Sequence, residues 1–122
     1  MSRQTFPNMM AQPGALLFSF RIDGSAVGAS AGSAGLNGRG KFMCEISKAA
    51  NVVTIDWTPA WGDLPDIIFQ PAAGQTDTIV ELVSESASQL VFQTVKATDN
   101  TAVNDADLIV YGVGYNTTSF VS

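Results

Sequence analysis

The feature that most constrains the fold of this chain is a two-residue alternation of apolar and polar side chains within short segments. In the first segment, residues 15–23, every even position from Leu16 to Ile22 is apolar. The odd positions include Ser19 and Arg21. A period of two matches an extended strand whose faces meet different surroundings, so the pattern predicts half-buried β-strands. Helical spacing is hard to find along the chain.

Clusters of Gly, Pro, Asn and Asp divide the chain into about seven such segments. The predicted strands cover residues 15–23, 41–47, 51–57, 66–70, 78–84, 88–96 and 106–113. Short strands at this spacing, without intervening helices, predict an all-β fold: a single antiparallel β-sandwich, jelly-roll-like. The length of 122 residues fits one domain.

Two stretches fall outside the alternation. Residues 1–14 contain apolar side chains without periodicity, and we expect them to form an extended N-terminal arm. Residues 24–40 are almost entirely Gly, Ala, Ser and Asn. They have too few large side chains to build a core, so we expect a long flexible loop within a β-sandwich domain that spans 15–122.

The composition argues against several classes of function. Six basic and eleven acidic residues give a net charge of −5, which disfavours nucleic acid as a partner. The absence of histidine removes His-based nucleophile activation and most zinc sites. The single cysteine, Cys44, lies in an apparent strand and is predicted to be a buried, inert thiol. We therefore expect no enzymatic activity.

No apolar run approaches the roughly 20 residues that a membrane-spanning helix needs. The N-terminus also lacks the apolar core and small-residue cleavage site of a secretion signal. We therefore expect no membrane partner and synthesis in a cytoplasm.

Acidic side chains gather in two predicted loops. Asp63 and Asp66 come close after Trp61, a combination that suggests a carbohydrate- or receptor-binding site. Trp57 ends an apolar strand, so we place it in the core. Carboxylates near tryptophans also occur in glycosidases, but acids that cap turn amides are far commoner.

The second acidic loop precedes the last strand. It supplies the hard oxygen donors of Asp99, Asp105 and Asp107, which suit Ca²⁺. Their spacing does not match the EF-hand pattern, so a solvated loop without a cofactor is the favoured interpretation.

The low charge content points to assembly. Charged residues make up 14% of the chain, too few to cover a surface in the usual mixed-sign pattern. Apolar residues near both ends, outside the strands, need a surface on which to dock; we expect Phe6, Met9, Met10 and Phe120 to serve assembly or anchoring. A closed homo-oligomer, with a trimer favoured, buries such surfaces without open-ended growth.

Parts of the sequence also resemble a known family. The run Ser88–Thr94, followed by Asn104–Gly112 with the pattern D-A-D-L-I-V-Y-G, is similar to the closing strands of small structural proteins of tailed bacteriophages. The segment Gly38–Ile46 is similar to their mid-chain hairpin. The resemblance covers residues 38–114, and the N-terminal arm has no counterpart in the pattern.

The resemblance implies a virion component with a compact β-sandwich, of the kind compared with the trimeric jelly-roll heads of the complement and tumour-necrosis-factor proteins. We therefore expect a noncatalytic virion protein that assembles in the host cytoplasm as an oligomer. Its partners are then the major capsid or tail proteins, and its role is capsid decoration, fibre or knob. The alternative is a carbohydrate- or receptor-binding β-sandwich module that uses Trp61, Asp63 and Asp66.

Overall fold

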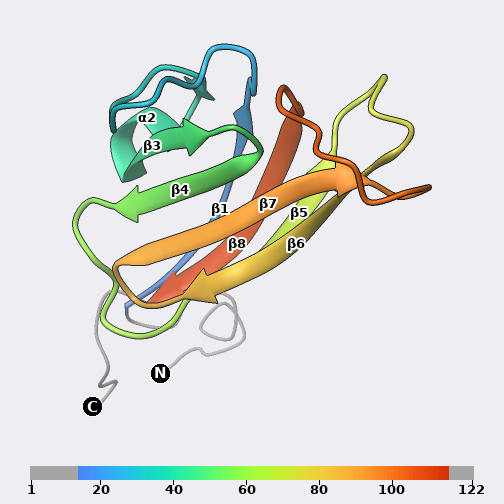
Figure 1. The fold of residues 1–122 in the computed structure, drawn as a ribbon. Helices are drawn as coiled ribbons and strands as arrows, with labels where there is room; N and C mark the ends of the chain where they lie inside the picture. The colour runs from blue at the N-terminus through green and yellow to red at the C-terminus, as the bar shows by residue number, and fades with distance from the viewer. Residues whose placement is uncertain (1–13, 116–122) are drawn as a thin grey trace.

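The computed structural model describes residues 14–115, which form two stacked antiparallel sheets (Figure 1). The strands are β1 (Ala15–Ile22), β2 (Leu36–Asn37), β3 (Cys44–Ala49), β4 (Val52–Trp57), β5 (Asp66–Pro71), β6 (Thr78–Glu85), β7 (Gln89–Lys96) and β8 (Leu108–Tyr115). Sheet A has the order β2-β1-β8-β5, and sheet B has the order β3-β4-β7-β6. The predicted all-β sandwich is confirmed.

The alternation in the sequence places the core between the sheets. Phe18, Phe20 and Ile22 of β1 are buried, as the pattern predicts. Their counterparts in sheet B include the buried Ile55 of β4 and Phe92 of β7. Alternate side chains of each strand therefore meet in one apolar layer, which supplies most of the stabilisation of a β-sandwich.

Strands that are distant in sequence pair at the centre of sheet A. β1 and β8 run antiparallel over their whole length, from Ala15 beside Tyr115 to Ile22 beside Leu108. β5 and β6 are consecutive in the chain but belong to different sheets. They are the edge strands on the same side of the sandwich, where they lie close together (Figure 1).

The glycine-rich stretch 24–40 is packed onto the sandwich. Val27 and Leu36 are buried in the core, and Leu36 begins β2, which makes eight strands in the described residues where about seven were expected. Gly32 exchanges two backbone hydrogen bonds with Ile46. These contacts fix a segment whose composition predicts a loop that forms no core of its own.

Residues 41–43 differ from the prediction. The chain forms a helical turn, α2 (Gly40–Met43), and the strand expected over 41–47 begins only at Cys44, opposite Trp57. Gly40 lies so close to the ring of Phe20 that a Cβ there would come within 2.7 Å of it. Phe42, which the alternation groups with Cys44, is 83% exposed as a result of this turn.

Several predictions concern residues outside the described range. The arm 1–14 falls there except for Gly14, and so do Phe6, Met9, Met10 and Phe120. Among residues 14–115, no helix is long and apolar enough to cross a membrane.

Two phenylalanines allow a matched test of the core. Phe92 is fully buried with its ring centroid 4.4 Å from that of Phe69, whereas Phe42 is largely exposed. We expect Phe92→Ala to lower the free energy of unfolding by about 3–5 kcal/mol, because it leaves a cavity in the core. Phe42→Ala should change it by less than about 1 kcal/mol. Urea unfolding of both variants measures the difference; equal losses would contradict this packing.

The docking of the 24–40 segment is tested by two glycines within it. A Cβ at Gly24 would overlap the backbone oxygen of Ala106, whereas a Cβ at Gly28 would have no heavy atom within 4 Å. We expect Gly24→Ala to lower the free energy of unfolding by about 1–3 kcal/mol through overpacking. Gly28→Ala should be neutral or slightly stabilising. If thermal unfolding shows the two variants to be equally stable, the segment does not dock as described.

Candidate functional site

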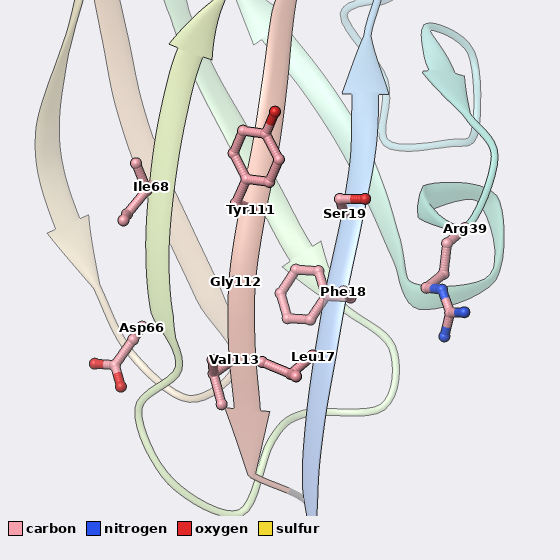
Figure 2. A pocket seen from close by; sticks show the side chains of 9 residues that line it. All are labelled: Leu17, Phe18, Ser19, Arg39, Asp66, Ile68, Tyr111, Gly112 and Val113. Carbon is pink, nitrogen blue, oxygen red and sulfur yellow. The ribbon is translucent and has the colours of Figure 1, made fainter. Parts of the chain in front are cut away.

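The outer face of sheet A carries a contiguous apolar surface, which we call the sheet A patch: Leu17, Ile68, Tyr111 and Val113. Leu17 of β1 pairs with Val113 of β8, and Tyr111 of β8 pairs with Ile68 of β5. Leu17, Ile68 and Tyr111 are 52%, 69% and 44% exposed. Figure 2 shows these side chains along a shallow groove of about 550 Å³.

Opposite charges lie on the two sides of the sheet A patch. Asp66 begins β5, and Arg39 precedes α2 on the far side of β1 (Figure 2). Both are exposed and line the groove. Among the described residues the one ion pair joins Lys48 to Asp105, so Arg39 has no carboxylate partner in that part of the chain. The groove therefore has an apolar floor with a negative and a positive rim.

Asp66 is also held by the end of β8. Its Oδ2 accepts a hydrogen bond of 2.9 Å from the hydroxyl of Tyr115. This bond, the largest cause, raises the pKa of Tyr115, and the charges of Asp66 and Asp63 act in the same direction. The Asp66 carboxylate is thereby oriented at the rim while remaining exposed to solvent.

A second apolar groove of about 370 Å³ lies between the edge strands β5 and β6. Its lining includes Phe69 on one strand and Ile79 and Leu82 on the other, and it shares Ile68 with the sheet A patch. Ile79 and Leu82 are exposed. The sandwich thus presents apolar surface both on one face and along its adjoining open side.

The three residues predicted to contact a ligand make different contacts in the structure. Trp61 packs against the core: its ring stacks on Phe18 at a centroid distance of 5.7 Å and meets Trp57 edge-on at 5.7 Å. It does not line the groove that Asp66 lines. Asp63 accepts a hydrogen bond from the backbone N–H of Leu64, a local contact typical of turn carboxylates.

The predicted core positions of Trp57 and Cys44 are confirmed. Trp57 is buried, and its indole Nε1 has no hydrogen-bond partner among the described residues. Cys44 is buried, and this burial, with a smaller effect from the negative charge of Asp56, raises the pKa of its thiol to about 12. The thiol therefore stays protonated at neutral pH, as expected for an inert cysteine.

The candidate calcium ligands form separate contacts with other groups of the protein. Asp99 accepts hydrogen bonds from Thr101, Asp105 pairs with Lys48, and Asp107 accepts one from the backbone N–H of Gly24. Within residues 14–115 no group of three or more potential metal ligands converges.

The sequence predicts which residues share a face of a strand, but it does not predict that the residues of the sheet A patch lie together. The alternation places Leu17 with Ser19 and Arg21, and it places Tyr111 with Val113 on one side of the last strand. Only the pairing of β8 with both β1 and β5 makes these separate residues into one surface.

Comparison with known proteins gives no further assignment: no family model, curated protein or solved structure matches this chain.

The burial of Cys44 predicts low thiol reactivity. At pH 8 we expect the folded protein to react with a disulfide reagent at least about 100-fold more slowly than the urea-unfolded chain, because the thiolate is scarce and enclosed. Ser30→Cys places a second thiol at an exposed position and serves as the control. In the folded Ser30→Cys variant, one thiol per chain should react rapidly with the reagent. Rapid reaction of the unaltered folded protein would refute the buried position of Cys44.

Proposed function

We propose that this protein is a noncatalytic structural component of a tailed-phage virion that assembles as a homo-oligomer on the capsid or tail. The observation that supports the proposal most directly is the sheet A patch. Three large apolar side chains there are about half exposed or more, and they lie side by side across three neighbouring strands.

Such a surface favours burial against another protein. Scattered exposed apolar residues are ordinary, but a contiguous apolar patch bounded by polar groups is typical of an interface. The low charge content strengthens this argument, because 14% charged residues provide little of the polar surface that keeps a monomer soluble. Assembly removes the apolar area from water.

The virion location is supported by the resemblance of residues 38–114 to small phage structural proteins. Of the two closing segments of that resemblance, the first falls on β7 and the second runs from the preceding loop into β8. The proposed partners are further copies of the chain and the major capsid or tail proteins. The role is mechanical: the sandwich is the rigid unit, and its apolar outer surfaces hold neighbouring subunits.

The proposal is tested on purified phage particles. We expect mass spectrometry of phage particles purified from the encoding organism to find this chain at a fixed ratio to the major capsid or tail protein. A non-structural protein encoded by the same phage is the control for carry-over. Abundance in the lysate together with absence from purified particles would contradict the proposal.

A further inference from the structure

The sheet A patch and its charged rims are complementary to a second copy of themselves. Arg39 and Asp66 lie on opposite sides of the groove, with the apolar side chains between them (Figure 2). Two copies can pack with these faces against each other about a two-fold axis parallel to the strands. In such a pair, the left side of one face lies over the right side of the other. The positive rim of each copy then lies over the negative rim of the other.

The strand register makes the apolar contacts match as well. Leu17 and Val113 are direct cross-strand partners on β1 and β8, so they stand at the same height along the strands. An axis that runs between β1 and β8 places Leu17 of one copy against Val113 of the second copy. Ser19 and Tyr111 are also cross-strand partners within one chain, so Tyr111 of one copy lies against the small side chain of Ser19 in the second copy.

We infer that the outer face of sheet A is the site at which two copies of this chain pair about a two-fold axis, with Arg39 of each copy opposite Asp66 of the other. This inference rests on the proposed function, since it identifies the surface through which the subunits self-associate. The pairing buries the sheet A patch and gives each rim charge a partner of opposite charge.

The two rim charges favour a second copy of the chain as the occupant. A partner of uniform charge would satisfy one rim and oppose the other, whereas a second copy brings one charge of each sign to the required side. Opposed charges at an interface rim select orientation and reject mismatched partners. The asymmetry of the groove is therefore the feature that selects self-pairing in this orientation.

Charge reversal tests the geometry. Analytical ultracentrifugation of the full chain should show a dimer. Its dissociation constant should rise roughly tenfold or more in Arg39→Asp and in Asp66→Arg, because each variant places like charges opposite each other. An equal mixture of the two variants should restore the dimer, because every rim contact in the mixed pair joins opposite charges. Lys96→Asp, on sheet B, is the control for a charge change alone.

A matched apolar pair tests the same surface. Leu17 and Val83 are similarly exposed, at 52% and 56%, but Val83 lies on β6 of sheet B. Leu17→Asp should dissociate the dimer, whereas Val83→Asp should leave it intact. Circular dichroism of all variants identifies any that fail to fold, and the mixing experiment remains decisive because restoration requires folded chains.

The outcomes separate this inference from the proposed function. The two-fold pairing would be overturned by an oligomer, such as a trimer, whose mass does not change in Arg39→Asp or Asp66→Arg. That result would not contradict the structural role. A chain that stays monomeric at high concentration also overturns the pairing. The structural role fails independently if the chain is absent from purified particles.

Discussion

The antiparallel pairing of β1 with β8 is the contact on which the rest of the structure depends. It joins the first and last described strands over eight residue pairs at the centre of sheet A. On the inner side the pairing sets Phe18, Phe20 and Val110 into the core. On the outer side it sets Leu17 beside Val113. Because a strand presents alternate residues to its two faces, one register decides both the packing of the core and the composition of the surface.

The aromatic contacts near one end of this pair show how closely the core and the surface are linked. The rings of Trp57 and Trp61 both contact Phe18. The Trp61 ring occupies the space that a Cβ at Gly114 would need, and Phe18 does the same at Gly112. Glycine in β8 therefore lets the aromatic rings close against the sheet. The same packing directs Trp61 toward the core, whereas Tyr111 of β8 is exposed in the sheet A patch.

The sparse charges of this chain acquire specific positions in the fold. Lys48 donates hydrogen bonds of 2.6 Å to the carbonyl oxygens of Gly24 and Asn104, and so ties the glycine-rich segment to the loop before β8. Arg39 and Asp66, in contrast, lie on opposite sides of an apolar groove. Lys48 thus serves internal contacts, whereas Arg39 and Asp66 flank an apolar surface, as the proposed self-pairing requires.

The sequence by itself determined most of the strands and the faces that they bury. The two-residue period of 15–23, 51–57 and 88–96 reports which side chains share a face, and their burial follows. Tertiary structure decided the rest. Residues 41–43 form a helical turn next to the close contact of Gly40 with Phe20. The glycine-rich segment is held by hydrogen bonds to β3 and to Asp107. The sheet A patch also required the fold, since alternation defines the two faces of a strand but not its neighbours, and only pairing brings residues 17, 68, 111 and 113 together.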